Sequence, residues 1–334
     1  MVPAERVPAL SQATARAHPN IALVKYWGKR DVDLNLPAVG SISVTLDSLC
    51  TTTTVRFDAG LDQDEFRLDG VCDDAATKRV SACLDLLRGL AGNTMRAEIS
   101  STNNFPTAAG LASSASGFAA LVTAAAAALG LELRREKLSE LARRGSGSAA
   151  RSLFGGFVEL HHGDQADGSD CVAEPLLDAG DWPLAVTVGV ISRAAKGTGS
   201  TDGMELTRHT SPYYRQWVDG QAGDLAAART AIEQRDFARL ADISEYSCLK
   251  MHALALAAQP GLLYWHPATV AGIHRVRELR RKGHAVFFTI DAGPQLKVIS
   301  LPDEVDTVSS ALRDLDGVVD VLHTGLGAGA QVID

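Results

Sequence analysis

The sequence predicts an α+β fold arranged in two lobes. Expected strands and helices mix along the chain without a strict β-α-β alternation, which favours α+β over a parallel α/β architecture. The chain has 334 residues and 46% hydrophobic content, enough for one large or two ordinary domains. We place the boundary at 178–183, which gives an N-terminal lobe over residues 1–183 and a C-terminal lobe over residues 184–334.

The N-terminal lobe is expected to begin with a strand over residues 14–18. The segment 41–57 is rich in β-branched residues and has turn-forming Asp47 and Ser48, which predicts a β-hairpin. Two Gly/Ser segments each lead into a helix. The helix after the first segment is expected to be buried and Ala-rich, and the helix after the second is expected to be short. The other expected elements are a helix over 75–91, a strand over 94–100, the buried helix over 117–131 and a charged helix over 134–144.

The C-terminal lobe is expected to open on a buried strand over residues 184–190. Three helices follow, and the lobe ends in strands that alternate with one further helix. The expected ranges are helices over 225–233, 238–257 and 267–282, strands over 284–290 and 296–301, a helix over 303–315 and a strand over 317–322.

Composition excludes several classes of function. The formal net charge is −8, so the protein as a whole repels nucleic acid and anionic lipid, and an anionic substrate needs locally gathered cations. Five scattered cysteines without a CxxC pair fit a reducing compartment. The adjacent His161 and His162 would point to opposite faces of a strand, which is a poor arrangement for chelating zinc. We expect a cytoplasmic protein without a signal peptide, a membrane segment or a metal site of its own.

A first candidate anion site is the segment 103–117, NNFPTAAGLASSASG, which directly precedes the apolar helix. Small residues let backbone N–H groups approach a ligand, and the helix N-terminus adds about half a positive charge. Ser113, Ser114 and Ser116 can add hydroxyl donors, so the segment suits a polyphosphate. It matches neither GxxxxGK[ST] nor GxGxxG, and simple helix capping is the alternative interpretation.

A second candidate anion site is the segment 144–156, RGSGSAARSLFGG. Ser148 and Arg151 are three residues apart and share a helix face, and Ser146 lies just upstream. Two hydroxyls, free N–H groups and a guanidinium form a clamp for carboxylate or phosphate. The alternative is a capped helix with a surface arginine.

Two further segments carry candidate catalytic groups. Lys25 stands among apolar residues in NIALVKYWGKRD (20–31), where partial desolvation would strengthen the action of its charge on a partner. Asp291 ends an apolar strand in HAVFFTIDAGP (284–294), directly before a tight turn, and is placed to point into a cleft. The alternatives are a lysine that extends to solvent and an aspartate that only initiates a turn.

Taken together, these segments resemble the GHMP kinase superfamily and, within it, the diphosphomevalonate decarboxylases, over about residues 14–332. The combination and its order carry the resemblance, and no single motif decides it. The matching segments are NIALVKYWGKRD (20–31), SISVTL (41–46), NNFPTAAGLASSASGFAAL (103–121), GSGSAARSLFGGFVEL (145–160), STDGMELT (200–207) and FTIDAGP (288–294).

The resemblance implies the two-lobed GHMP kinase fold, with an N-terminal lobe like ribosomal protein S5 domain 2 and a ferredoxin-like C-terminal lobe. It implies that ATP, with magnesium, phosphorylates the 3-hydroxyl of 5-diphosphomevalonate, after which phosphate and carbon dioxide leave and isopentenyl diphosphate forms. It also implies a homodimer that acts on small molecules.

Matching positions in the family imply the roles of individual residues. Catalytic roles fall to Asp291, which faces the 3-hydroxyl, its ionic neighbour Lys25, Arg151 at the substrate carboxylate, and Ser114 near the transferred phosphoryl group. The substrate site is expected to consist of Tyr26, Lys29, Ser146, Ser148, Arg151, Ser200, Thr201 and Met204. The ATP phosphates are expected at Pro106, Thr107, Ala108, Ala109, Gly110, Leu111, Ala112, Ser113, Ser114 and Ser116.

The chain departs from the family pattern at two places. Val39 and Gly40 stand where the family usually has Asn-Ser, and Gln295 replaces the asparagine of DAGPN. The first departure bears on nucleotide or substrate contacts. Three alternatives stay open: a superfamily kinase that releases a phosphorylated product, a decarboxylase of mevalonate 5-phosphate, and an inactive sensor that binds the same ligands.

Overall fold

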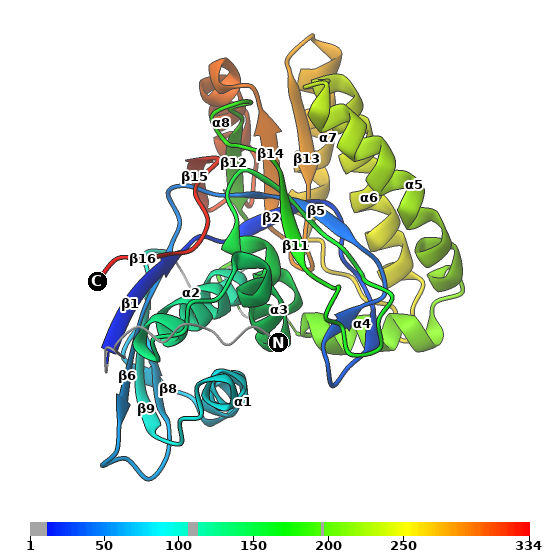
Figure 1. Cartoon of the computed structure of the whole chain (residues 1–334). Helices are drawn as coiled ribbons and strands as arrows, with labels where there is room; N and C mark the ends of the chain where they lie inside the picture. Colours follow the sequence, from blue (N-terminus) through cyan, green and yellow to red (C-terminus); the bar gives the residue numbers. More distant parts are fainter. Residues whose placement is uncertain (1–11, 106–112, 195–196) are drawn as a thin grey trace.

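The computed structural model describes residues 12–105, 113–194 and 197–334 and confirms the α+β class (Figure 1). In the described residues, the two larger sheets of the N-terminal half have six and four strands. The six-stranded sheet has the order β16-β1-β6-β9-β7-β8, and a four-stranded sheet has the order β11-β10-β5-β2. Their strands are β1 (Gln12–Ala17), β2 (Asn20–Val24), β5 (Ser41–Thr45), β6 (Thr51–Asp58), β7 (Glu65–Leu68), β8 (Val71–Cys72), β9 (Arg96–Asn103), β10 (Phe157–Leu160), β11 (Ala173–Leu177) and β16 (Gln331–Val332).

Helices of the N-terminal half pack against both of these sheets. The Ala-rich α2 (Ser113–Ala128) is buried on nearly all sides and contacts β1 and β6, since its small side chains allow close approach. The other elements here are α1 (Asp74–Ala91), α3 (Arg135–Gly145), the 3₁₀ helix η1 (Gly147–Leu153) and the short strands β3 (Lys29–Asp31) and β4 (Leu36–Pro37). The expected helix 75–91 matches α1, which Asp73 caps at its start and left-handed Gly92 ends.

The C-terminal half forms a sheet of order β13-β14-β12-β15 with helices packed against it. Its strands are β12 (Ala185–Val190), β13 (Val286–Thr289), β14 (Leu296–Ser300) and β15 (Asp320–Gly325). Its helices are α4 (Ser200–Thr210), α5 (Tyr214–Glu233), α6 (Phe237–Leu256), α7 (Pro267–Arg281), the 3₁₀ helix η2 (Pro302–Glu304) and α8 (Val305–Arg313). Of these, α4 has no counterpart among the expected elements, and α5 begins well before the expected residue 225.

The expected hairpin over 41–57 is wrong. β5 pairs with β2 and β10, whereas β6 pairs with β1 and β9, so the two strands lie in different sheets. Their burial explains the difference: every residue of β5 is buried, while burial alternates along β6. The segment between them crosses from one sheet to the other, with Leu46 bridged to Leu326.

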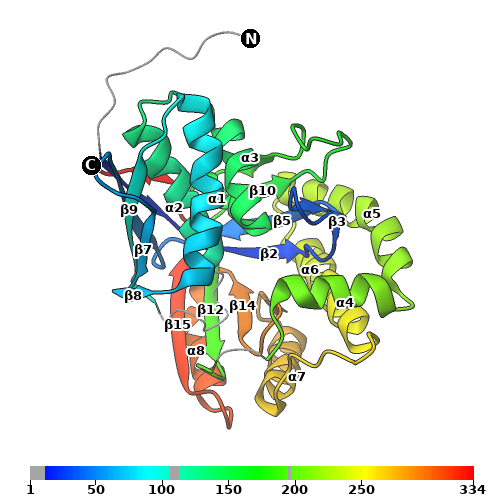
Figure 2. The same ribbon diagram turned by 90° about the horizontal axis from the view of Figure 1, so that it is seen from below.

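One apolar core joins the two halves. Ile21 and Val44 of the N-terminal half pack in the same cluster as Val186 and Phe287 of the C-terminal half. Figure 2 shows β2 and β5 between α1–α3 on one side and the C-terminal sheet on the other. The final strand β16 pairs with β1, so the C-terminal segment returns to the N-terminal sheet. The division at 183/184 stays a prediction.

None of the helices in the described ranges has the length and apolar character needed to cross a membrane.

Candidate active site

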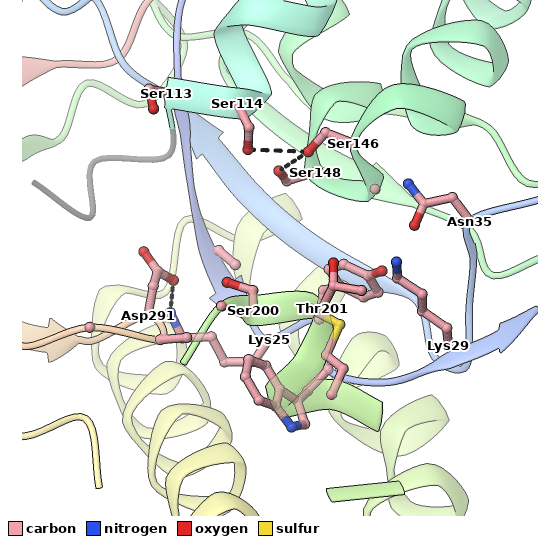
Figure 3. A pocket seen from close by; sticks show the side chains of 18 of the residues that line it. Lys25, Lys29, Asn35, Ser113, Ser114, Ser146, Ser148, Ser200, Thr201 and Asp291 are labelled. Atoms are coloured by element: carbon pink, nitrogen blue, oxygen red, sulfur yellow. Dashed lines mark hydrogen bonds and ion pairs between the residues drawn. The ribbon is translucent and has the colours of Figure 1, made fainter. Parts of the chain in front are cut away.

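A cavity of about 790 Å³ lies where the two halves meet. Its wall is formed by the segment after β2, the start of α2, the junction of α3 and η1, the start of α4 and the turn after β13. Figure 3 shows Ser114, Ser146 and Ser148 on one side of this space and Lys25 and Asp291 on the other. The four segments singled out in the sequence therefore converge, although residues 106–112 of the first anion loop lie outside the described residues.

The carboxylate of Asp291 is held by two buried lysines. Lys25 Nζ donates to Asp291 Oδ1 over 2.6 Å, and Lys297 Nζ lies 3.1 Å from Oδ2. Both lysine side chains are 1% exposed, while that of Asp291 is 31% exposed towards the cavity. Burial alone would raise the pKa of Asp291, but the two lysine charges and their hydrogen bonds hold that pKa well below its usual value. Asp291 is therefore a carboxylate at neutral pH.

Helices α5 and α6 fix the backbone of Lys25. Its N–H donates to Ser247 Oγ at 2.9 Å, and its carbonyl accepts from Gln221 Nε2 at 2.9 Å. Because these contacts satisfy the main chain just beyond β2, the side chain is free to reach Asp291 across the floor of the cavity.

Arg151 is buried and held by neutral oxygens. Its Nε donates to Asn20 Oδ1 at 3.1 Å and to Ser43 Oγ at 2.9 Å, and Nη1 donates to Ser41 Oγ. Burial lowers its pKa to about 10, with the charge of Asp291 opposing that change, so the guanidinium stays charged at neutral pH. A guanidinium whose hydrogen-bond partners in the described residues are neutral is well placed to receive an anion.

Three serine hydroxyls connect the two anion-binding segments. Ser146 Oγ lies 3.3 Å from Ser114 Oγ and 3.3 Å from Ser148 Oγ (Figure 3). Ser113 also lines the cavity. Ser116 does not: it is fully buried, and its Oγ contacts Thr51 Oγ1 at 2.6 Å and donates to the carbonyl of Ser113. Its hydroxyl is engaged in the interior and is not part of the described cavity wall.

The remaining residues expected at the substrate site also line the cavity: Tyr26, Lys29, Ser200, Thr201 and Met204. The Tyr26 hydroxyl is buried and has no hydrogen-bond partner among the described residues, and burial raises its pKa above the usual value. Burial lowers the pKa of Lys29. An unpartnered buried hydroxyl costs stability unless a ligand satisfies it, which supports a polar ligand here.

Sequence reasoning missed three cations around this cavity. Arg79 of α1 donates to the carbonyl of Gly145 at 3.0 Å, and Arg144 carries a buried Nε without a partner in the described chain. Both line the cavity, and Lys297 lies behind Asp291. Arg144 is the first residue of the segment 144–156, and Lys297 interrupts an otherwise apolar strand. Both residues could therefore have been recognised as candidate site residues from the sequence. Arg79 could be found only once α1 was placed beside α3.

The wall is strongly cationic. In the described part of the chain it contains five cationic side chains and a single carboxylate, Asp291. The cations are Lys25, Lys29, Arg79, Arg144 and Arg151. Since the protein as a whole carries net charge −8, this concentration of positive charge marks a site for a highly anionic ligand.

The departures from the family pattern have local structural explanations. Val39 is 3% exposed within an apolar cluster that includes Trp27 and Met251, and neither Val39 nor Gly40 is among the described residues of the cavity wall. A Cβ added at Gly40 would lie 2.8 Å from Leu225 Cδ1, so close packing against α5 favours glycine.

Gln295 lies in the cavity wall and is buried. Its Oε1 accepts from the Ile191 N–H at 2.6 Å, and its Nε2 donates to the Ser192 carbonyl. The residue therefore joins the end of β12 to the turn after Asp291.

Comparison with known proteins points to one family over most of the chain. The family model described as diphosphomevalonate decarboxylase-like N-terminal domain matches residues 17–173, and the mevalonate 5-diphosphate decarboxylase C-terminal domain matches residues 186–327. Human diphosphomevalonate decarboxylase is 40% identical over 318 residues, which cover 89% of this chain and 78% of the human protein.

Solved structures are equally similar. The mevalonate diphosphate decarboxylase from Staphylococcus aureus superposes with a TM-score of 0.91 at 40% identity, covering 97% of this chain and 98% of that one. The enzyme from Enterococcus faecalis, in a structure concerned with mevalonate diphosphate mediated ATP binding, gives 0.89 at 40% identity, with 98% and 100% covered. A structure of MDDEF in complex with MVAPP, AMPPCP and magnesium gives 0.90 at 40% identity, with the same coverage. The chain belongs to the diphosphomevalonate decarboxylase family.

Proposed function

We propose that this chain catalyses the ATP-dependent decarboxylation of (R)-5-diphosphomevalonate to isopentenyl diphosphate, with release of ADP, phosphate and carbon dioxide. The observation that carries the proposal is the cavity in which five cations surround one ionised acid, Asp291. Relatives that are similar over nearly the whole chain bear the name of this activity.

The chemistry explains why such a site uses ATP. Hydroxide on a tertiary carbon is a poor leaving group, whereas phosphate is a good one. Transfer of the γ-phosphoryl group to the 3-hydroxyl therefore activates that carbon, and the group departs again as phosphate. The electrons of the carboxylate C–C bond then move towards C3 as carbon dioxide leaves, and the new double bond forms. Phosphoryl transfer needs positioning and charge neutralisation more than covalent help from the protein.

The described residues divide between these tasks. Asp291 orients the 3-hydroxyl and accepts its proton late, because its paired lysines make it a weak base. Arg151 receives the substrate carboxylate. The diphosphate contacts are Tyr26, Lys29, Ser146, Ser148, Ser200 and Thr201, with Arg79 and Arg144 as further cations and Met204 as an apolar contact.

ATP is placed at the start of α2. Ser113 and Ser114 present hydroxyls to the cavity there, and the helix N-terminus favours phosphate. The greater part of the proposed phosphate loop, residues 106–112, lies outside the described residues and stays a prediction from the sequence.

Magnesium fits the site as a companion of ATP. No group of three or more His, Cys, Asp or Glu side chains in the described chain could hold a metal ion, and the one carboxylate of the cavity wall is engaged by two lysines. We therefore place the ion on phosphate oxygens, where it would neutralise charge during phosphoryl transfer.

Three properties remain proposals beside the reaction. The first is a division into lobes at 183/184, which the two family-model ranges support. The others are a homodimeric assembly and a cytoplasmic location. Light scattering after size-exclusion chromatography and cell fractionation test these two directly.

Incubation with ATP and either mevalonate 5-phosphate or 5-diphosphomevalonate, following carbon dioxide and phosphate release, tests the reaction. Carbon dioxide from the diphosphate is the expected result. A stable phosphorylated product without carbon dioxide would indicate a kinase. Preference for the monophosphate would indicate a decarboxylase of mevalonate 5-phosphate. Binding without turnover would indicate a sensor, against which the joint presence of Lys25, Arg151 and Asp291 argues.

A further inference from the structure

Lys297 is a charged residue in the interior of the C-terminal sheet. It lies on β14 between apolar neighbours, pairs with Thr289 of β13 and Val188 of β12, and is 1% exposed. A buried ammonium group is costly unless it is paired and hydrogen-bonded. A central strand therefore tolerates this lysine only if an anion lies within reach.

The anion is Asp291, and the two lysines engage different oxygens of it. Lys25 reaches Oδ1 at 2.6 Å, and Lys297 reaches Oδ2 at 3.1 Å. Lys25 follows β2 in the N-terminal half, whereas Lys297 belongs to β14, the strand beside β13, and Asp291 lies in the turn that follows β13. One contact therefore spans the two halves of the chain, while the other stays within the C-terminal half.

We propose that Lys297 is a positioning residue for the reaction, which locks the orientation of the Asp291 carboxylate through its second oxygen. This inference rests on the proposed function, in which Asp291 faces the 3-hydroxyl. With only Lys25 in place, the carboxylate could rotate about its Cβ–Cγ bond. With both oxygens held, its remaining lone pairs point in fixed directions, which near-attack geometry demands.

The other titratable groups that face Asp291 cannot replace the positive charge of Lys297. Arg151 of η1 acts on Asp291 as a third cation and is held elsewhere by neutral oxygens. Cys248 and His252 approach from α6, but burial raises the pKa of the thiol to about 11 and lowers the pKa of the imidazole to about 3. Both are neutral at pH 7, so neither compensates for the loss of a lysine.

Removal of the Lys297 charge has a predictable sign. The two lysines hold the pKa of Asp291 below its usual value against the opposing effect of burial. Loss of one ammonium leaves the effect of burial less opposed, so the pKa of Asp291 rises. The carboxylate then becomes protonated at a higher pH, so the acid limb of the pH profile of kcat/KM shifts to higher pH.

The test compares Lys297→Met and Lys297→Gln with Ile299→Val. Met keeps the length and removes the charge, Gln keeps a hydrogen-bond donor without charge, and Ile299 is a fully buried residue of the same strand outside the cavity wall. We expect kcat to fall about 10- to 100-fold in both lysine variants, less than the roughly 10²–10⁴-fold contribution of a positioned acid or base, because Asp291 itself remains. The KM of each substrate should stay within about threefold, and Ile299→Val should keep the wild-type kcat and pH profile.

A readout without turnover separates this inference from the proposed reaction. A ¹³C NMR titration of the Asp291 carboxyl in the full chain should show its midpoint raised in both lysine variants and unchanged in Ile299→Val. An unshifted midpoint, or wild-type kcat in Lys297→Gln, would overturn the positioning role whatever the substrate is. If Lys297→Met does not fold, Lys297→Gln carries the same comparison.

Discussion

Lys25 Nζ and Asp291 Oδ1 lie 2.6 Å apart although 266 residues separate them in the chain. The contact exists only when the segment after β2 meets the turn after β13. The candidate catalytic pair therefore forms only when the two halves of the chain are packed together. The apolar core that contains both Ile21 and Phe287 holds that docking in place. Stability of this shared core and integrity of the site are therefore linked.

We expect Asp291→Asn to reduce turnover by about 10²–10⁴-fold while both ligands still bind. Asn keeps the size of the side chain and is a good turn residue, so the turn that closes with the Gly293 N–H on the Asp291 carbonyl should persist. What disappears is the charge that aligns the 3-hydroxyl. Steady-state turnover, together with calorimetric titration of the substrate and of an ATP analogue, checks this.

The same change removes the counter-charge of two buried lysines, so a lowered melting temperature is expected as well. Calorimetry should therefore be performed well below the transition. Near-normal turnover would contradict the catalytic role, and lost binding in a protein that melts early would assign Asp291 a structural role instead.

Serine substitutions should distinguish the two anion sites. Ser148→Ala should raise the KM for diphosphomevalonate by about tenfold and leave the KM for ATP near its wild-type value, because hydrogen bonds to charged groups contribute about 1.5–3 kcal/mol each. Ser146→Ala should affect both constants, since its hydroxyl lies 3.3 Å from both Ser114 and Ser148. The test is the KM for each substrate, measured with the other substrate at a saturating concentration. If Ser148→Ala changed the KM for ATP as much as the KM for diphosphomevalonate, the assignment of two separate anion sites would be contradicted.

The diphosphate should be preferred over the monophosphate by about tenfold or more in kcat/KM. The donors are more numerous than one terminal phosphate needs, and losing one or two charge-assisted hydrogen bonds has this effect. They are Tyr26, Lys29, Ser146, Ser148 and Ser200. Parallel initial-rate measurements with the two substrates check the ratio. Because Val39 and Gly40 lie outside the described wall, these departures do not weaken the expectation.

Gly40→Ala should destabilise the fold without changing either KM. The added Cβ would lie 2.8 Å from Leu225 Cδ1 and 3.0 Å from the Leu160 carbonyl, and overpacking of this kind costs roughly 1–3 kcal/mol. Gly220→Ala is the matched control, because its Cβ would meet nothing within 4 Å and it lies in α5, where alanine is favoured. Urea unfolding of both variants gives the comparison, and an altered substrate KM in Gly40→Ala would place this residue nearer the site than the structure does.

Local signals explain which elements could be predicted. α7 has Pro267 at its first position and Gly283, with φ of +97°, just after its end, so its range was readable from the sequence. α4 has weak helix formers such as Thr201 and Gly203, and its packing against α6 decides its structure. The hairpin error has the same origin, because strand pairing between β5 and β10 is set by tertiary contacts.

The candidate site was predictable where a motif was contiguous. Lys25, Ser146, Ser148 and Asp291 were recognisable from short segments, and the structure brings them to one cavity. Arg79 lies far from those segments in the sequence and joins them only through the packing of α1. A single sequence contains no direct record of such contacts.

The pairing of β16 with β1 has a consequence for biosynthesis. β1 (Gln12–Ala17) is synthesised long before β16 (Gln331–Val332), which covers its outer edge, and before Asp334, whose carbonyl accepts from the Thr14 N–H at 2.9 Å. Until β16 has been made, that edge presents unpaired backbone groups, which are a template for intermolecular association. Nascent chains stalled before residue 331 should therefore depend on chaperones far more than chains in which β16 has already paired with β1.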